Sequence, residues 1–334
     1  MISALRSAGV EVIERHVSVW EGRREGWTAG AGTAARIALA EVRLARRVRG
    51  DVDALVVGYP GQPDLAAARR AARGRPVVFN ALVSLHETLV DDRRRFRPGS
   101  IPARALLTLD RAALRAADLV VADTDAHAQF LAQLTGRSDI AVCFVGAEER
   151  LFRPGWQARS PFTTLFVGKL IPLQGIETIL AAAELAPELP FRLVGSGQLA
   201  QLLDARPANV EHLAWIEYER LPDELRRAGC ALGIFGTTAK AQRVIPNKVF
   251  QALACGVPVV TADTPAAREL LADGESALLV PPGDPDALAD AVRRLAADEE
   301  LARRIAIGGR AAYERAASET VLGSRWRALI EGLL

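Results

Sequence analysis

The chain has 334 residues, of which 50% are hydrophobic and 5% aromatic. This length suffices for about two domains of roughly 100–200 residues each. A formal net charge of +2 at pH 7 excludes the overall basic excess of a protein whose main partner is nucleic acid, so we expect no nucleic-acid partner. Most of the apolar content is Ala, Leu and Val, which is typical of helices packed on parallel sheets.

Charge is divided unevenly along the chain. Up to residue 155 there are 23 Arg and 18 acidic residues, whereas the remainder holds 19 basic and 22 acidic residues. A basic first half could face an anionic acceptor or a membrane surface, and a difference this small is also common in ordinary surface composition. The run Arg93-Arg94-Arg95-Phe96-Arg97 leaves the same two interpretations open: contact with an anionic lipid or acceptor, or a solvated loop.

The cysteines and the apolar runs indicate the compartment. Cys143, Cys230 and Cys255 are far apart in apolar contexts and are predicted to be buried thiols in a reducing environment. No stretch approaches the ~20 uninterrupted apolar residues of a membrane helix, and the N-terminus lacks the apolar core of a secretory signal. We expect a cytoplasmic protein, with contact at the inner face of the membrane left open.

Elements follow one another in a regular order. Residues 1–8 resemble the end of an amphipathic helix, and short β-rich runs then alternate with helical stretches, which predicts βα units and parallel sheets. First-half strands are expected at 10–17, 54–59, 76–83, 119–122 and 140–145, and second-half strands at 164–169, 191–194, 210–215, 231–235, 257–262 and 277–280. The pattern predicts an α/β protein with two Rossmann-like domains, residues 1–155 and 156–319, followed by a C-terminal helix at 320–334.

The beginning of the chain departs from the usual doubly wound sheet. Such a sheet normally opens with a strand and a glycine-bearing turn. Here a helix precedes the first expected strand, so the first strand of the N-terminal domain is predicted to be missing.

One helix has clear boundaries in the sequence. Pro246 can occupy its first turn, Asn247 can help to cap it, Gly256 can close it in a left-handed conformation and Pro258 forbids its continuation. On this helix Lys248 and Gln251 are three residues apart and share a face.

Lysine usage singles out three positions. Of 42 basic residues only Lys169, Lys240 and Lys248 are lysine, so these positions are candidates for a compact ammonium rather than a generic cation. Gly168 and Lys169 end a predicted strand, where ligands bind in open α/β sheets, and an ammonium there could meet a diphosphate. Lys248 lies in a first helical turn, which disfavours a cation unless an anion shares the site. A surface position is the alternative for both lysines.

Two further segments are weaker candidates. Gly195-Ser196-Gly197 follows a predicted strand, so its backbone could approach a ligand and Ser196 could donate a hydrogen bond. The third glycine of a dinucleotide fingerprint is absent, which counts against a nicotinamide or flavin enzyme. His86 follows a first-domain strand and could contact a reacting sugar or phosphate, or be structural. The other histidines and the cysteines lack metal-ligand spacing, so no metal site is expected.

Together these segments resemble the family 4 (group 1) glycosyltransferases. The resemblance rests on residues 167–177, 193–197, 246–260 and 269–283, and less specifically on 117–124 and 144–154. It implies the GT-B fold, with two Rossmann-like domains whose parallel sheets face each other across a cleft that holds the active site. It also implies sugar transfer from a UDP- or GDP-sugar to a glycan or lipid-linked acceptor, with retention at the anomeric carbon and without a metal or other cofactor.

The resemblance also implies roles for particular residues. Lys169 falls on a basic position that contacts the donor diphosphate, and Gln251 replaces a Glu that holds the donor ribose. Gln174 replaces a second basic residue, so Lys248 would have to supply that charge. Arg243 replaces a Glu that contacts the donor sugar, which suits an anionic sugar or a subfamily variation. We expect Lys169, Lys248 and His86 to serve catalysis, and the donor to contact the following residues: Gly168, Gly195, Ser196, Gly197, Arg243, Asn247, Gln251 and Glu269.

Two other functions stay open. A chain that lacks the first strand could be an inactive or truncated nucleotide-sugar-binding protein. A nucleotide-sugar epimerase of GT-B fold would need an acid/base pair, and His86 with Glu87 is a poor one if both lie on a strand, where neighbours face opposite ways.

Overall fold

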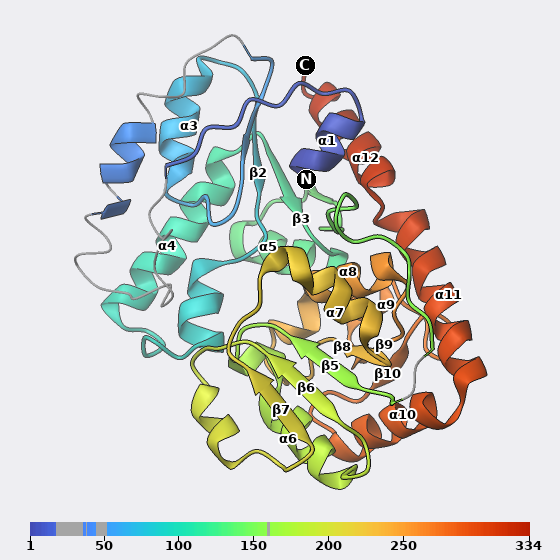
Figure 1. Ribbon diagram of the computed structural model, residues 1–334. Coiled ribbons are helices and arrows are strands. Elements are labelled where there is room, and N and C mark those ends of the chain that lie inside the picture. Colours follow the sequence, from blue (N-terminus) through green and yellow to red (C-terminus); the bar gives the residue numbers. More distant parts are fainter. Residues whose placement is uncertain (18–35, 38, 45–51, 159–160) are drawn as a thin grey trace. The chain divides into compact units, whose positions relative to one another are not determined.

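The computed structural model describes residues 1–17, 36–37, 39–44, 52–158 and 161–334. The chain divides into two compact units, each with one parallel sheet (Figure 1). Unit 1 contains Met1–Ala8, Thr124–His127 and Phe144–Arg325, and unit 2 contains Gly9–Asp123, Ala128–Cys143 and Trp326–Leu334. The expected domain limits, 155/156 and 319/320, therefore both lie within unit 1.

Unit 2 is built on a four-stranded parallel sheet with the order β1-β2-β3-β4. Its central strands are almost entirely buried, with only Leu119 half-buried, because helices follow them on the sheet faces, as parallel sheets require. The strands are β1 (Leu55–Val57), β2 (Val77–Asn80), β3 (Leu119–Ala122) and β4 (Ile140–Val142). The helices are α3 (Asp64–Ala72), the π-helix η1 (Glu87–Asp92), α4 (Ile101–Ala116) and α5 (Asp125–Thr135), of which residues 125–127 belong to unit 1.

The N-terminal segment corrects one prediction and confirms another. The strand expected at 10–17 is wrong, since these residues form no regular element. Glu11, Glu14, Arg15 and His16 are exposed there, so the segment offers no continuous apolar face to a sheet. The preceding helix is confirmed as α1 (Ile2–Ser7), which buries Ala4 and Leu5.

Unit 1 contains a six-stranded parallel sheet with the order β10-β9-β8-β5-β6-β7. The strands expected in the second half of the chain are confirmed, with small shifts at their ends. They are β5 (Thr164–Val167), β6 (Phe191–Val194), β7 (Val210–Leu213), β8 (Cys230–Leu232), β9 (Val259–Ala262) and β10 (Leu278–Val280).

Helices cover both faces of this sheet. One apolar cluster joins it to α6 (Ile176–Leu185) and α10 (Pro285–Ala297). The other cluster joins it to α7 (Leu221–Arg227) and α8 (Asn247–Cys255). The remaining elements are α9 (Pro265–Arg268), α11 (Glu299–Ala316), α12 (Glu319–Glu331) and the 3₁₀ turns η2 (Pro172–Gln174), η3 (Ala200–Ala205), η4 (Tyr218–Arg220) and η5 (Ala241–Arg243).

The helix α8 forms as the sequence predicts. It begins at Asn247, directly after Pro246, and ends before Gly256, which has a left-handed φ of 72°. The N-cap position is Pro246, without a side-chain cap, so Asn247 is the first helical residue rather than the cap. No acidic residue lies in the first turn, and Lys248 therefore stands at the positive end of the helix without a carboxylate from the helix itself.

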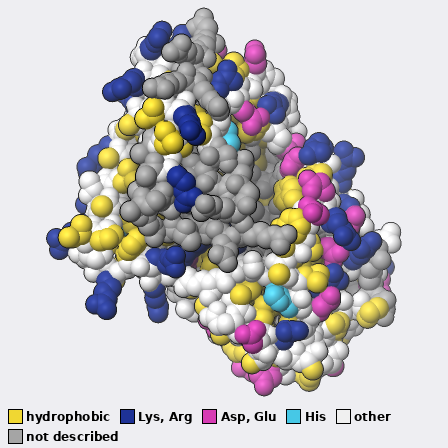
Figure 2. Space-filling view, turned by 60° about the vertical axis from the view of Figure 1, so that its left-hand side comes forward, with side chains coloured by type: hydrophobic (Ala, Val, Ile, Leu, Met, Phe, Trp, Pro, Cys, Tyr) yellow, Lys and Arg dark blue, Asp and Glu magenta, His cyan; other side chains and the backbone are white. Residues whose placement is uncertain are grey.

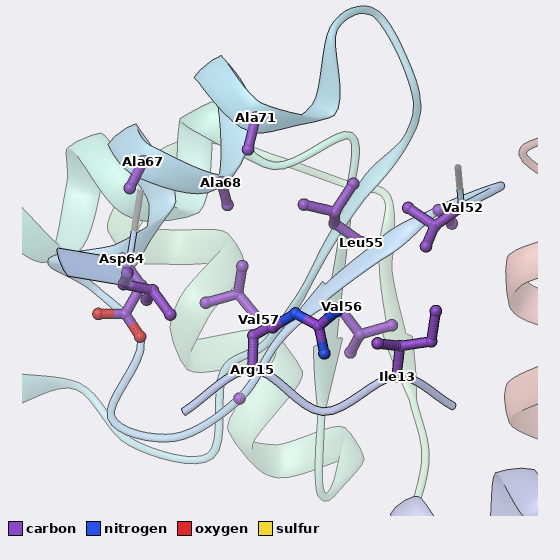
Figure 3. A pocket seen from close by; sticks show the side chains of 13 residues that line it. Ile13, Arg15, Val52, Leu55, Val56, Val57, Asp64, Ala67, Ala68 and Ala71 are labelled. Atoms are coloured by element: carbon purple, nitrogen blue, oxygen red, sulfur yellow. The ribbon is translucent and has the colours of Figure 1, made fainter. Parts of the chain in front are cut away.

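A pocket of ≈ 210 Å³ lies in unit 2, between β1, α3 and the segment around Ile13. Figure 3 shows that Leu55, Val57 and the alanines of α3 border it, with the Asp64 carboxylate nearby. Close to it, burial and the neighbouring Asp64 raise the pKa of Glu41 to about 8. The lining is mainly aliphatic, and it contains none of the residues that the sequence suggests for chemistry.

Candidate functional site

The sheet of unit 1 has a point where its strand order reverses. From β5 the chain builds outward through β6 and β7, and then continues on the other side of β5 through β8, β9 and β10. The helices that follow β5 and β8, α6 and α8, lie on opposite faces of the sheet. Open α/β sheets bind ligands outside the carboxyl ends of the strands at such a switch point, and Gly168 and Lys169 follow β5 there.

The loops after β5 and β6 are joined to each other backbone to backbone. Leu170 donates to the carbonyl oxygen of Ser196 at 3.0 Å, and Gly168 donates to the carbonyl oxygen of Val194 at 2.9 Å. A Cβ atom on Gly195 would lie 1.8 Å from the Gly168 oxygen, and one on Gly197 would lie 2.7 Å from the Leu170 oxygen. These glycines are therefore required for the packing of one loop on the other. The sequence pattern did not predict this role.

A turn links the carboxyl ends of β5 and β8. Gln174, at the end of η2, accepts a hydrogen bond through its backbone oxygen from the N–H of Phe235 at 3.1 Å. The next residue, Gly175, has φ 69°, and a Cβ atom there would lie 2.5 Å from the carbonyl carbon of Phe235. The Gln174 side chain is consequently held in place by a backbone that has little room to shift.

Lys248 reaches into this switch point from α8. Its Nζ donates to Oε1 of Gln174 at 2.5 Å and lies 3.6 Å from the centre of the Phe166 ring. A Cβ atom on Gly168 would be 3.1 Å from the same Nζ, so the ammonium lies directly beside the loop that carries Lys169. The structure thus brings together Gly168, Gln174 and Lys248.

Burial lowers the pKa of Lys248 well below its usual range. A neutral amide and an aromatic ring do not compensate fully for the water that the ammonium has lost. Between the folded and unfolded pKa values the unfolded chain binds more protons, so this lysine makes the folded state more stable as the pH rises through that window.

We expect this effect to appear in a comparison with Lys248→Met. The free energy of unfolding of the wild type relative to this variant should rise with pH, by up to about 1.4 kcal/mol per pH unit where the titration is steepest. Urea unfolding at a series of pH values between neutral and alkaline measures it. A difference between the two proteins that stays constant with pH would contradict the buried position of the ammonium.

Other expected donor contacts lie on neighbouring elements of unit 1. Lys169 and Ser196 are exposed at the ends of β5 and β6, and Asn247 is exposed at the start of α8. Gln251 lies one turn after Lys248 and approaches the hydroxyl of Tyr218, with 3.5 Å between Nε2 and the oxygen. Tyr218 was not singled out from the sequence, because its position in the 3₁₀ turn η4 has no signal in the residue pattern.

Arg243 and Glu269, two other expected donor contacts, form hydrogen bonds with residues 124–126. The backbone oxygen of Arg243, in η5, accepts a hydrogen bond from the Thr124 hydroxyl at 2.5 Å. The Glu269 carboxylate accepts from the backbone N–H groups of Asp125 and Ala126, at 2.7 and 2.9 Å. Glu269 therefore satisfies free N–H groups in the first turn of α5, where a carboxylate also complements the helix dipole.

His86 lies in unit 2, at the start of the π-helix η1. It is not in a strand, because β2 ends at Asn80, and the expectation that His86 and Glu87 face opposite ways on a strand is wrong. Nδ1 of His86 lies 3.6 Å from a carboxylate oxygen of Asp91, so its acidic neighbour is one turn along the helix.

A buried carboxylate organises the loop before His86. Asp110 of α4, 1% exposed, accepts hydrogen bonds from the backbone N–H groups of Leu85 and His86, from the Ser84 hydroxyl and from the Gln62 amide, at distances of 2.7–3.2 Å. Burial raises the pKa of Asp110, and these four donors oppose the rise.

We expect Asp110→Ala to lower the free energy of unfolding by about 3 kcal/mol, because three buried donors and one part-buried donor would lose their acceptor. Urea unfolding monitored by circular dichroism measures the loss. The matched control is Asp139→Ala, which removes an exposed partner of Arg137 and should cost about 1 kcal/mol or less. Equal losses in the two variants would show that the Asp110 interactions add nothing beyond a surface pair.

The basic run of the first half is exposed. Arg94, Arg95 and Arg97 are exposed, Phe96 is half-buried, and the nearby Ile101 is 84% exposed. On the face shown in Figure 2, Lys and Arg side chains are spread among Asp, Glu and apolar side chains.

In the described parts of the chain, no three His, Cys, Asp or Glu side chains are grouped so that they could hold a metal ion. Within the same residues, no helix combines the length and apolarity that crossing a membrane requires. Cys143, Cys230 and Cys255 are buried thiols, as the sequence predicts.

Comparison with known proteins agrees with this geometry. Residues 161–298 match the family model described as Glycosyl transferases group 1. A phosphatidyl-myo-inositol mannosyltransferase of Mycobacterium leprae is 31% identical over 163 residues, which are 46% of this chain and 42% of the relative. A D-inositol 3-phosphate glycosyltransferase of Acidothermus cellulolyticus is 30% identical over 66% of this chain and 52% of the relative. The chain thus spans about half the length of these two relatives.

Solved structures with the same fold are more distant in sequence. Sucrose-phosphate synthase from Thermosynechococcus elongatus superposes with a TM-score of 0.73 at 19% identity, over 90% of this chain and 78% of the other. Anabaena Alr3699/HepE in complex with UDP-glucose superposes with a TM-score of 0.67 at 19% identity, over 89% and 82%. Residues 161–298 thus resemble the glycosyltransferase group 1 family, and the chain shares the two-sheet α/β fold of these solved glycosyltransferase structures.

Proposed function

We propose that the chain is a glycosyltransferase that takes a sugar from a nucleoside-diphosphate donor bound at the switch point of the six-stranded sheet. The observation that carries this proposal is the position of the Lys248 ammonium beside Gly168, at the carboxyl end of β5 where Lys169 follows. A diphosphate brings two negative charges to the place where the Lys248 Nζ lies beside Gly168 and where Lys169 follows in the chain. The proposed donor-binding domain is residues 156–319, which includes both lysines.

The proposed chemistry follows from charge. When the bond between the anomeric carbon and the diphosphate oxygen breaks, negative charge develops on the departing phosphate. Preorganised cations stabilise that charge more in the transition state than in the ground state, and so accelerate the step. The oxygen of the acceptor hydroxyl forms the new bond on the same face, with retention, and its proton passes to the departing phosphate oxygen. Lys169 and Lys248 supply the stabilising charge, so the proposal includes no metal.

The relatives' names guide the choice of donor and acceptor. Anabaena Alr3699/HepE is described in complex with UDP and with UDP-glucose, so UDP donors are tested first, and GDP donors remain in the comparison. Two of the curated relatives are named for phosphatidyl-myo-inositol or D-inositol 3-phosphate. We therefore propose a hydroxyl-rich acceptor, with inositol, its phosphate and a lipid-linked form as the first candidates.

Isothermal calorimetry tests the donor site. UDP, GDP, UDP-glucose and a GDP-sugar are titrated into the wild type, Lys169→Ala and Lys248→Met, with Arg304→Ala as a control for an exposed cation of α11. We expect one nucleotide class to bind the wild type and the control equally, and to bind both lysine variants about tenfold or more weakly. Absence of binding by every nucleotide would overturn the proposal.

Product analysis then separates the activities. Mass spectrometry of donor incubated with each acceptor detects transfer, and NMR of the product reports the anomeric configuration. Binding without turnover on any acceptor would favour a nucleotide-sugar-binding protein. A changed sugar in the free nucleotide sugar would favour an epimerase, for which His86 and Asp91 would be the acid/base pair to mutate.

A lipid-linked acceptor would be met at a membrane surface, and we propose that unit 2 contacts it. The exposed Arg94, Arg95 and Arg97 and the exposed Ile101 combine positive charge with an apolar side chain, which suits an anionic bilayer. Sedimentation with vesicles of phosphatidylglycerol should carry down the wild type but not the triple Arg→Ala variant. Equal sedimentation of both proteins would reject this contact.

A further inference from the structure

The contacts of Lys248 are unusual for a residue that meets phosphate. Lys248 is half-buried and its Nζ has lost water through burial. The hydrogen-bond partner of Nζ is the neutral amide of Gln174, and its other close neighbour is the Phe166 ring. Gln174 is itself only 8% exposed. In such surroundings the protonated form of the side chain is disfavoured in free energy. It has lost the stabilisation by water, and neither neighbour carries a negative charge that would compensate for this loss.

The charged groups on surrounding elements do not provide that negative charge. Burial is the sole cause that acts on the pKa of Lys248, and it lowers it. The Glu269 carboxylate is bonded to the N–H groups of Asp125 and Ala126, and Arg310 of α11 bonds the Ala254 carbonyl at the other end of α8. Other titratable side chains on the adjoining loops and helices include Lys169, Glu177, Tyr218, Glu219, Asp223, Glu224, Arg226, Lys240 and Arg243.

We infer that Gln174 is the positioning residue that holds the Lys248 side chain in the donor site, and that Lys248 takes up a proton as the nucleoside diphosphate binds. This inference rests on the proposed donor site. A diphosphate beside Nζ supplies the negative charge that the empty site lacks, so binding favours the ammonium over the amine. The proton comes from the solvent, and no bond of the donor changes in this step.

The choice of an amide at position 174 has a physical consequence. The Gln174 oxygen fixes the direction of Nζ without cancelling its charge, and its backbone is held by Phe235 and by the lack of space at Gly175. A carboxylate in its place would keep Lys248 protonated in the empty site and would also repel the diphosphate. An apolar side chain at position 174 would offer no acceptor, so the Lys248 side chain could adopt other rotamers.

Proton uptake can be measured directly. Calorimetric titrations of UDP-glucose, or of the nucleotide sugar that binds best, are run in two buffers with different heats of ionisation, at several pH values from 6.5 to 9. A nucleotide sugar is used rather than free UDP because both of its phosphates are esterified and have no proton that titrates near neutral pH. The dependence of the heat on the buffer gives the number of protons taken up per donor bound.

We expect the wild type to take up a proton fraction that grows toward one as the pH rises. Its affinity should correspondingly fall by up to about tenfold per pH unit at the alkaline end. Lys248→Met should bind more weakly, with no uptake and a flat pH profile. Gln174→Glu should also lose the uptake, because its lysine is already protonated. Gln174→Leu should lower the affinity and displace the pH profile, whereas the exposed Gln201→Leu control should match the wild type.

Three results would overturn the inference. They are binding by the wild type without proton uptake at any pH, uptake that persists in Lys248→Met, and an unchanged pH profile in Gln174→Leu. In each of these cases the donor still binds, so the proposed function survives. If no nucleotide sugar binds the wild type at all, the proposed donor site itself is wrong and this inference fails with it. Circular dichroism of every variant verifies that it is folded.

Discussion

Replacing Lys169 with alanine is expected to lower kcat/KM for sugar transfer by about 10²–10³-fold, the usual effect of removing one group that stabilises developing negative charge. The side chain lies at the end of β5, where it is exposed to solvent, and the core does not depend on it. The thermal midpoint should therefore stay close to that of the wild type. Steady-state kinetics at saturating acceptor, together with a thermal melt, measures both quantities.

Two further variants make the Lys169 result specific. Arg304→Ala removes an exposed cation from α11, far along the chain from the loop of Lys169, and should leave kcat/KM unchanged. Lys169→Arg keeps the charge but changes its shape, and should recover part of the activity. If Lys169→Ala transfers sugar as fast as the wild type, the exposed ammonium takes no part in the reaction.

Replacing Gly195 with alanine is expected to cost about 3 kcal/mol of folding free energy or more, and to abolish donor binding. The added Cβ atom would lie 1.8 Å from the Gly168 oxygen, and backbone on both sides of that contact is fixed by sheet hydrogen bonds. The two loops would have to separate, which displaces Gly168 from beside the Lys248 ammonium. Urea unfolding and nucleotide titration follow the two effects separately.

The matched control for Gly195 is Gly58→Ala, because a Cβ atom on Gly58 would have no atom within 4 Å. That variant should unfold at nearly the same urea concentration as the wild type. A Gly195→Ala protein that is as stable as Gly58→Ala would mean that the loops after β5 and β6 move apart at little cost. The rigid placement of Gly168 in the donor site would then be disproved.

Apolar runs and the positions of Gly and Pro in the sequence were sufficient to predict most strands of unit 1 and the limits of α8. Strand β8 is a continuous apolar run between Gly229 and Gly233, and β6 and β9 are mostly apolar and follow Pro190 and Pro258. A strand buried on both faces needs such an apolar run. The limits of α8 follow from Pro246 and Gly256, whose backbone preferences act locally. The strand expected at 10–17 fails because its apolar residues are interrupted by exposed charges, and only pairing with a neighbouring strand decides whether such a segment joins a sheet.

The candidate site divides in the same way. The rarity of lysine singled out Lys169 and Lys248, and positions at the ends of predicted strands singled out Gly168 and Gly195. Each of these signals depends only on the residue type and its immediate sequence neighbours. The sequence did not predict the hydrogen bond between the Lys248 side chain and the Gln174 side-chain oxygen, since 74 residues separate the two positions. Nor could it assign the Glu269 carboxylate to the first turn of α5, 143 and 144 residues away.

By itself, the sequence determined the alternation of strands and helices, the limits of α8 and the positions of the rare lysines, because each depends on local backbone preference or on residue type. Only the tertiary structure decided why Gly195 must be glycine and which neutral partner holds Lys248. Those features arise where the ends of β5, β6 and β8 meet, and the order in which parallel strands assemble is set by packing across the whole sheet rather than by any short segment.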